Sequence, residues 1–406
     1  QRRNFFKVFM KHNYYQEIYI KTKEHLEDFC RNLGNISRIM LDTEFVSEYT
    51  YYPQMGLIQV CTDEILALID PVTIEDLSPF LDILFDKKVE KVIHAGRIDL
   101  SIFLHIGGKV PLPVFDTQVA SSLVGFGSSI SYHNLVRELC GVRLRKTATY
   151  TNWLRRPLSR EQIEYAKNDV RYLGVVADKL KKKLDEHGRA GWAKEEFEKL
   201  IDVVKREASS EYIMNSRSVK GAHLLSPREK KVLYHLYLFR EDMARKKNLP
   251  RGKVLRDDLL VEIARRKPDS IEDIEEIRGI SKRSLRKIGP QILKAVRSGL
   301  ADREPGNKIK AARSRPKPSD AAVISLLMSL LGIRANQAKV AQNIVSTRQE
   351  VQLLVEAFPD IKNLNLPVLG GWRKELVGND MLDVLSGKAH LGVNKEGKLQ
   401  IYRYRD

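Results

Sequence analysis

Residues 38–60 read RIMLDTEFVSEYTYYPQMGLIQV, and this stretch places two acids inside a run of strand-forming residues. Asp42 and Glu44 are two positions apart. A strand points positions i and i+2 to the same face, so both carboxylates lie on one side of the predicted strand. Two readings are open at this point: both acids are solvated, or a cation lies between them.

The order of strands and helices around this stretch predicts the fold class. Strand-like runs at 39–46, 57–62 and 65–69 are separated by short loops, which is typical of an antiparallel meander. Downstream, strands are predicted at 88–95 and 113–117. Helices are predicted at 74–85, at 97–107 and from 117 to about 125. Strands that first pair and then alternate with helices predict a mixed sheet flanked by helices.

The chain has 406 residues, enough for two or three domains, and its net charge of +18 is unevenly distributed. Residues 1–200 contain 29 Lys and Arg against 27 Asp and Glu, whereas residues 201–406 contain 41 against 25. The C-terminal half is therefore predicted to face a polyanion, with nucleic acid the first candidate and plain solubility the alternative.

Other features narrow the class of protein. The longest apolar run, at 321–333, is too short to span a bilayer, and QRRNFFKVFM at the start has no apolar core of a secretory signal. Met10 is a candidate natural start, which makes residues 1–9 an N-terminal extension. The three cysteines have no metal-type spacing, so we expect a reducing, cytoplasmic compartment and no disulfides. From the short apolar run, we expect no membrane association.

Three more residues combine with the first two acids. Asp99 follows a buried-looking strand, although acids also favour helix N-termini in general. Tyr165 and Asp169 are four apart on a helix, where they share a face, or else simply form its solvated flank. Four carboxylates without His or Cys make an all-oxygen site of the kind that Mg²⁺ or Mn²⁺ prefers. Two such ions can clamp a phosphoryl displacement while a tyrosine orients the water.

Capping signals and composition indicate where later segments begin. Ser159 with Gln162, and Ser226 with Glu229 after Pro227, are capping boxes that start helices. Residues 302–320 contain three prolines and six basic residues, typical of a linker. A helical pattern resumes at 321 and is expected to continue to about 391.

Three motifs in order resemble those of the DEDDy 3′–5′ exonucleases: DTEF (42–45), HAGRIDLSIF (94–103) and YAKNDVRYL (165–173). The stretch CGVRLRKTATYTNWLRRPLSREQIEYAKNDVRYL (140–173) is similar to ribonuclease D nearly end to end. Residues 233–280 resemble the helicase-and-RNase-D C-terminal (HRDC) domain, a small helical bundle that binds nucleic acid. LPVLGGWRKELVGNDMLDVLSGKAHLGV (366–393) is similar, less closely, to the end of the family's second such domain.

The resemblance implies a ribonuclease H-like α/β exonuclease domain followed by one or two all-α HRDC bundles. The expected divisions are an exonuclease domain at 10–208, a first HRDC domain at 222–302, a basic linker at 303–319 and a diverged second HRDC-like domain at 320–406. It further implies that two divalent cations, Mg²⁺ or Mn²⁺, are held by Asp42, Glu44, Asp99 and Asp169, with Tyr165 positioning the nucleophilic water. The implied activity is trimming of RNA 3′ ends, tRNA precursors included, with no protein partner expected.

Candidate nucleic-acid contacts lie in basic clusters with aromatic residues among them. The loop before the third motif carries Tyr150 and Trp153, and we expect Trp153 to pack in the core while some of the arginines contact phosphate. Gln59 and His94 could reach the substrate, or be ordinary structural residues. The predicted contacts are Arg143, Arg145, Lys146, Arg155 and Arg156 in the loop, Gln59 and His94 near the acids, and Lys246, Lys247, Arg251 and Lys253 in the HRDC segment.

Two other functions fit the same pattern. A 3′–5′ DNA exonuclease that acts in DNA repair would use identical chemistry. The three motifs do not distinguish ribose from deoxyribose. A non-catalytic RNA-binding protein would keep the fold but lack one ligand, and here the motif is complete. Asp42 and Glu44 are also expected to repel each other without a cation, which should raise the pKa of at least one.

Overall fold

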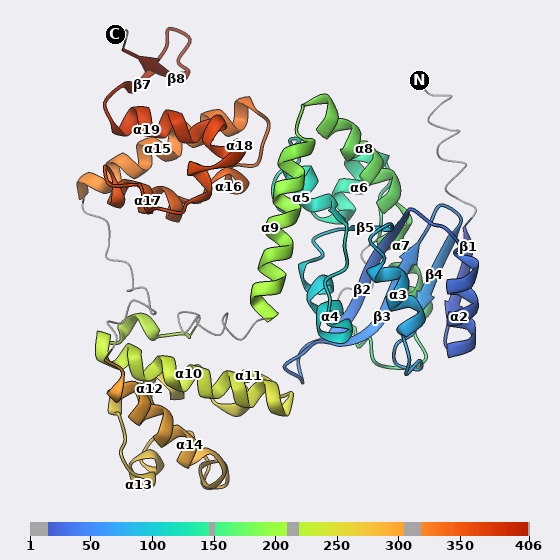
Figure 1. The fold of residues 1–406 in the computed structure, drawn as a ribbon, viewed down its shortest axis with the longest axis horizontal. Coiled ribbons are helices and arrows are strands. Elements are labelled where there is room, and N and C mark those ends of the chain that lie inside the picture. The colour runs from blue at the N-terminus through green and yellow to red at the C-terminus, as the bar shows by residue number, and fades with distance from the viewer. Residues whose placement is uncertain (1–14, 146–150, 209–218, 304–317, 405–406) are drawn as a thin grey trace.

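The computed structural model describes residues 15–145, 151–208, 219–303 and 318–404. Its N-terminal domain contains a mixed sheet of six strands in the order β1-β4-β3-β2-β5-β6 (Figure 1). The strands are β1 (Gln16–Ile20), β2 (Arg38–Val46), β3 (Gln54–Cys61), β4 (Ile65–Ile69), β5 (Glu90–Ile93) and β6 (Val114–Asp116). β2, β3 and β4 pair antiparallel, which confirms the predicted meander, and the other pairs are parallel.

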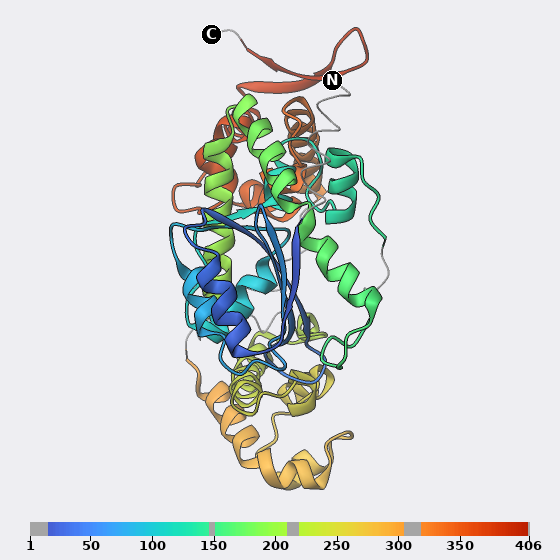
Figure 2. The same ribbon diagram turned by 90° about the vertical axis from the view of Figure 1, so that its right-hand side faces the viewer.

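Helices cover both faces of this sheet, as Figure 2 shows with the sheet between them. One face packs against α2 (Lys23–Asn32), α3 (Ser78–Phe85) and α4 (Arg97–Gly107). The other packs against α5 (Thr117–Ser122), α6 (Tyr132–Cys140), α7 (Arg160–Arg171) and α8 (Leu173–Glu186). A longer helix, α9 (Ala190–Ala208), contacts the edge strand β6 as well as α4 and α5. The predicted mixed sheet flanked by helices is therefore confirmed.

Three elements of this domain have no counterpart in the sequence prediction: β1, α2 and α6. The helix predicted to start at Ser159 is followed directly by a second one. The capping box of Ser159 and Gln162 starts α7 as predicted, but Tyr172 separates α7 from α8. The backbone N–H of Tyr172 donates to the hydroxyl of Tyr132 at 3.1 Å, so a partner from another helix replaces the usual helical one.

The next domain is a helical bundle with its own core. Its helices are α10 (Pro227–Lys247), α11 (Arg251–Val254), α12 (Asp257–Arg266), α13 (Ile271–Glu275) and α14 (Lys282–Ala301), preceded by the short η3 (Ala222–Leu224). Ser226 and Glu229 form the predicted capping box with Pro227 at the first helical position.

The C-terminal domain is helical up to Leu385 and then changes character. Its elements are α15 (Pro318–Gln337), α16 (Gln342–Val345), α17 (Arg348–Ala357), η5 (Pro367–Leu369), α18 (Gly371–Arg373), η6 (Lys374–Gly378), α19 (Asn379–Leu385), β7 (Ala389–Val393) and β8 (Leu399–Arg403). The helical expectation up to about residue 391 is wrong in its last part, because β7 and β8 form an antiparallel hairpin. Gly387 has a φ of 76°, a left-handed conformation that ends the helix before the alternating strand pattern begins.

Both helical domains contact the N-terminal domain, which contains the six-stranded sheet. In the interface with the C-terminal domain, the guanidinium of Arg373 donates to both carboxylate oxygens of Glu196 on α9, each at 2.6 Å. The indole rings of Trp192 and Trp372 stack beside this pair with centroids 4.5 Å apart. In the other interface, Tyr51 from the β2–β3 loop contacts α10 and α11. Within the described residues, no helix has both the length and the apolar character needed to cross a membrane.

Candidate active site

The first two acids and the tyrosine lie between strand β2 and helix α7. Asp42 and Glu44 share the face of β2 that packs against α7, where Tyr165 and Asp169 lie one helical turn apart. Asp42 is opposite Gln59 on β3, and Glu44 is opposite Leu57. The β2–β3 register shifts directly after Glu44, between Glu44 and Phe45. Such a bulge re-aims the side chains that follow it, next to the acid pair.

The third acid, Asp99, approaches Asp42 and Glu44 from the opposite face of the sheet. Asp99 lies in the first turn of α4, which packs on the opposite face. Thr43, between the two acids of β2, points to that face, and its hydroxyl donates a hydrogen bond to Oδ1 of Asp99. Asp99 is 8% exposed and Thr43 is 5% exposed, so this contact is buried. The bond fixes the Asp99 carboxylate against the strand that carries Asp42 and Glu44.

The pKa values show that Asp99 and Asp169 lie close enough to act on the two acids of β2. Burial and the charges of Asp99, Asp169 and Glu44 raise the pKa of Asp42 well above its ordinary value. Burial and the charges of Asp169 and Asp99 raise the pKa of Glu44 to about 8. Burial likewise raises the pKa of Asp99 to about 6 and that of Asp169 to about 7. The expected rise in the pKa of at least one acid of the first pair is confirmed.

Tyr165 is placed to act on this group of acids without being charged. Burial and then the charges of Asp169, Glu44 and Asp42 raise its pKa, so its hydroxyl stays protonated at neutral pH. A hydrogen bond from Tyr165 to Asp169 partly opposes the rise in the pKa of that acid. The indole of Trp153 lies with its centroid 6.1 Å from the Tyr165 ring. Trp153 is 3% exposed, so the prediction that it packs in the core is confirmed.

The donor set fits hard divalent cations. Oxygen ligands of high charge density are what Mg²⁺ and Mn²⁺ select, and their double charge would relieve the repulsion that raises these pKa values. With the side chains as they lie, no group of three or more His, Cys, Asp or Glu residues in the described parts of the chain is arranged to hold a metal ion. The chemistry of the four carboxylates nevertheless fits a metal centre.

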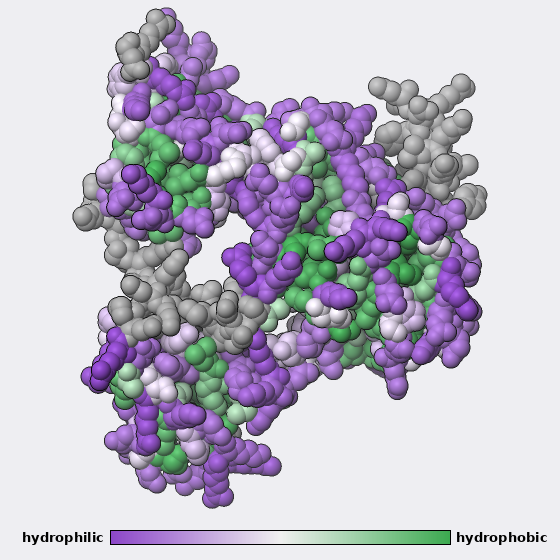
Figure 3. Space-filling model, viewed as in Figure 1, coloured by the Kyte–Doolittle hydropathy of each residue, from purple (hydrophilic) through white to green (hydrophobic). Residues whose placement is uncertain are grey.

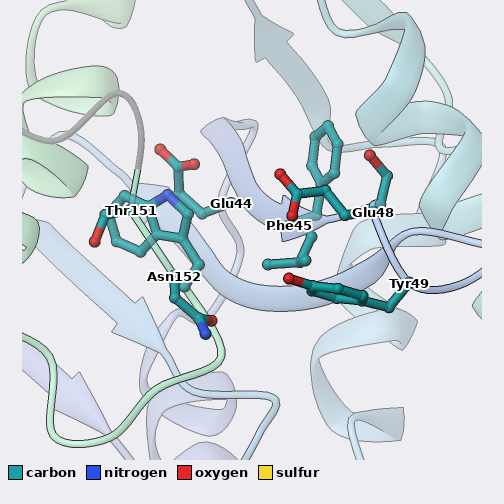
Figure 4. A pocket seen from close by; sticks show the side chains of 9 residues that line it. Glu44, Phe45, Glu48, Tyr49, Thr151 and Asn152 are labelled. Atoms are coloured by element: carbon teal, nitrogen blue, oxygen red, sulfur yellow. The ribbon is translucent and has the colours of Figure 1, made fainter.

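An open cleft of about 500 Å³ adjoins Glu44 (Figure 4). One wall is the segment after the bulge, which carries Phe45, Glu48 and Tyr49. The other is formed by Thr151, Asn152 and Trp153, from the loop before α7. Figure 4 shows the Glu44 carboxylate on the side of Thr151 and Asn152, across from Glu48 and Tyr49. Tyr49, which lines this cleft, is 69% exposed.

Four of the predicted nucleic-acid contacts are buried or bonded within the protein instead. Arg156 donates to both oxygens of the fully buried Asp70 at 2.6 Å and to the carbonyl of Gly56. His94 contacts Thr117 and a backbone carbonyl through its two ring nitrogens. Gln59 is 0% exposed, and Arg251 donates to Glu241 and Tyr51. The hydrogen bonds favour structural roles for Arg156, His94 and Arg251. The side chain of Gln59 is buried, and neither its amide nitrogen nor its amide oxygen has a hydrogen-bond partner among the residues that the structure describes.

The other predicted contacts are on the surface or outside the described residues. Arg143, Arg145, Arg155, Lys247 and Lys253 are exposed, and Lys246 is exposed with an ion pair to Asp242. Lys146 and Tyr150 lie outside the described residues. Contact of these side chains with RNA stays a prediction.

Sequence reasoning missed two residues of the site. Thr43 lies between Asp42 and Glu44 in the sequence. Because alternate residues of a strand point to opposite faces, its side chain was predictable as pointing away from theirs, toward the face where Asp99 lies. Tyr132 carried no signal, because it comes from α6, a helix that was not predicted. Burial and then the charge of Asp169 raise the pKa of Tyr132, so an uncharged phenol borders the acid group.

Comparison with known proteins agrees with this geometry. A family profile described as 3′–5′ exonuclease matches residues 18–185, and one described as HRDC domain matches residues 229–296. The chain is 36% identical over 373 residues to ribonuclease D of Bartonella henselae, covering 89% of this chain and 88% of that protein. It is 35% identical to ribonuclease D of Sphingobium indicum, covering 95% and 98%.

A solved structure extends the similarity to three dimensions. The crystal structure of Escherichia coli RNase D, described as an exoribonuclease involved in structured RNA processing, superposes with a TM-score of 0.77. The match has 31% sequence identity and covers 92% of this chain and 99% of that one. The similarity therefore includes both helical domains as well as the domain with the sheet.

Proposed function

This chain belongs to the ribonuclease D family, and we propose that its 3′–5′ exoribonuclease activity resides in Asp42, Glu44, Asp99, Asp169 and Tyr165 and uses two divalent cations. The observation that carries the assignment is that the charges of Asp99 and Asp169 both raise the pKa values of Asp42 and Glu44 at one end of β2. When bound, the cations would supply a water nucleophile of lowered pKa and stabilise the leaving oxygen.

The protein's own side chains have separable roles in this proposal. Asp42 and Glu44 would hold the cations from the sheet, Asp169 from α7 and Asp99 from α4. Thr43 holds the Asp99 carboxylate in place by its hydrogen bond. The neutral Tyr165 hydroxyl orients the attacking water, a role that a raised pKa favours because the group remains a hydrogen-bond donor.

For the substrate, we propose a folded RNA with a single-stranded 3′ tail, with tRNA precursors as one such class. The E. coli relative is described as acting in structured RNA processing, and similarity to it covers nearly the whole chain. The open cleft beside Glu44 accepts an unpaired end, since it lies between the end of β2 with its following loop and the loop before α7. The helical domains add the positive charge of the C-terminal half.

The test compares matched RNA and DNA tails with Mg²⁺ or Mn²⁺. Wild-type protein should release mononucleotides stepwise from a tRNA-like RNA with a 3′ extension. Asp42→Asn and Asp169→Asn should abolish release while keeping the wild-type circular dichroism spectrum. Asp185→Asn, at an exposed acid of α8, is the matched control and should keep full activity. Undiminished release by Asp42→Asn would refute the site assignment, and equal release from DNA would refute the preference for RNA.

A further inference from the structure

The C-terminal hairpin has one buried face and one exposed face. β7 and β8 pair in a regular register, with Ala389 opposite Arg403 and Val393 opposite Leu399. Ala389 is buried, and Leu391 and Ile401 pack against the core of the C-terminal domain. The residues between them, at even positions, point the other way. The hairpin lies outside the residues matched by the HRDC profile, which end at 296.

The exposed face carries three aromatic rings side by side. His390 is directly opposite Tyr402, and their rings stack with centroids 5.5 Å apart and planes 18° apart. The centroid of the Tyr404 ring lies 5.1 Å from that of His390. Tyr404 is 63% exposed and Tyr402 is 36% exposed. A Cβ on Gly392 would come within 3.0 Å of the Tyr402 ring, so the glycine lets that ring lie close to the strand.

Positive charge surrounds these rings. Residues 388–404 contain four Lys and Arg against one Glu. Arg403 is paired with Asp380 and Asp383, whereas Lys388, Lys395 and Lys398 are exposed. On the face shown in Figure 3, the end of the C-terminal domain that carries the hairpin is hydrophilic, and a nonpolar patch lies over the helices farther down. Exposed rings within a basic surface are therefore not part of a hydrophobic interface.

We propose that the exposed face of the β7–β8 hairpin is a second binding site for single-stranded RNA. Unpaired bases would stack on His390, Tyr402 and Tyr404, while Lys388, Lys395 and Lys398 contact the phosphates. Charge complementarity favours a polyanion, and stacking on an exposed ring favours one with splayed bases. This site goes beyond the proposed catalytic function, and rests on it only in taking RNA as the polyanion.

The position of the hairpin determines which part of an RNA it can hold. Figures 1 and 2 both show it projecting from the C-terminal domain, away from the sheet that carries Asp42 and Glu44. A short RNA with its 3′ end at the acids therefore does not reach the hairpin, whereas a long one does. A purely structural role for these rings would be to stabilise the hairpin, as cross-strand aromatic pairs do.

The experiment separates these roles by RNA length. Binding of 5′-labelled oligouridylates of about 5 and about 30 nucleotides is measured by fluorescence anisotropy in EDTA, which prevents turnover. The double variant His390→Ala/Tyr404→Ala should weaken binding of the long RNA by about fivefold or more and leave the short RNA unchanged. Tyr404→Phe keeps the ring and should bind like wild type. Val393→Ala, on the opposite face and equally exposed, is the matched control.

The lysines give an independent measurement. Lys395→Gln/Lys398→Gln should flatten the slope of log Kd against log salt concentration by about 1.4 for the long RNA, since each single-strand phosphate contact contributes about 0.7. Unchanged affinity of the double aromatic variant for the long RNA, an equal loss of affinity for both lengths, or an equal loss in Val393→Ala would overturn the proposal. Release of mononucleotides from the short RNA with Mg²⁺ should be the same in all these variants. If wild-type protein released no mononucleotides, the catalytic proposal would be refuted and the binding result would still stand.

Discussion

The side-chain carbonyl of Asn248 accepts hydrogen bonds from the backbone N–H groups of both Tyr51 and Tyr52, each at 3.1 Å. Asn248 ends α10 in a left-handed conformation with φ of 47°. The Tyr51 hydroxyl next to it donates to the buried Glu241 and accepts from Arg245 and Arg251. The first helical bundle thus holds the β2–β3 loop, whose start forms one wall of the cleft at Glu44.

Asn248→Gly should loosen this loop without straining α10, because glycine adopts the left-handed conformation freely. We expect faster hydrogen exchange at the amides of Tyr51 and Tyr52 and a rise in KM for tailed RNA of up to about tenfold, from two lost hydrogen bonds of about 0.5–1.5 kcal/mol each. Asn248→Asp keeps the acceptor oxygen and is the matched control. Unchanged exchange in the glycine variant would show that the loop is fixed by other contacts.

Thr43→Val should weaken the metal site while keeping the shape of a buried side chain. The Thr43 hydroxyl opposes the rise in the pKa of Asp99 caused by burial, and valine removes that donor. The Asp99 carboxylate would then hold its proton more tightly and compete less well for a cation. We expect about a tenfold higher Mg²⁺ concentration at half-maximal activity, the equivalent of about 1.4 kcal/mol. Thr43→Ser keeps the hydroxyl and should retain the wild-type requirement.

The metal-free protein should lose stability as the pH rises. The folded-state pKa of Glu44 is about 8, well above its ordinary value, so between those two values the folded state binds more protons than the unfolded state. Its contribution is fully present at acid pH and is lost as the pH rises through about 8. In EDTA, the Tm of Glu44→Gln should therefore exceed that of wild type by an amount that grows with pH.

Two comparisons check the cause of this effect. Glu48→Gln changes an exposed acid in the loop that follows β2 and should follow wild type at every pH. Mg²⁺ should narrow the gap between wild type and Glu44→Gln, because a bound cation offsets the repulsion among the acids. A constant gap across the pH range would show that the repulsion is absent.

Glu196→Ala should release the C-terminal domain from α9. Glu196 and Arg373 are 8% and 5% exposed and form a bidentate pair, so removing the acid leaves a buried guanidinium unpaired. Breaking such a pair costs about 3–5 kcal/mol. A larger radius of gyration by small-angle scattering and an earlier unfolding transition are expected. Glu196→Leu/Arg373→Met removes both charges and should recover most of the loss.

Arg156→Lys should be nearly as damaging as Arg156→Ala. Asp70 is fully buried, and burial alone would raise its pKa, but the bonds from Arg156 keep that pKa below its ordinary value. A lysine cannot reproduce two parallel bonds to the carboxylate together with those to the carbonyls of Gly56 and Trp153. Both variants should lower the Tm. If Arg156 served only to contact phosphate, the Tm would be unchanged and RNA binding alone would weaken.

Local patterns in the sequence determined much of the exonuclease-like domain. The alternation in 38–46 predicted strand β2 and put Asp42 and Glu44 on one face, because side-chain direction in a strand depends only on parity. The four-residue spacing of Tyr165 and Asp169 placed both on one side of a helix for the same kind of reason. The capping boxes at Ser159 and Ser226 were readable because they are local hydrogen-bond patterns.

Only the tertiary structure determined which contacts those side chains make. Arg155 and Arg156 are adjacent and alike in sequence, yet one is exposed and the other is bonded to Asp70, 86 positions away. Contacts of this kind bring together segments whose separation along the chain carries no periodic signal, and burial then sets which charges are free. The same holds for the pairing of Tyr51 with α10, and for the change from helix to hairpin after Leu385.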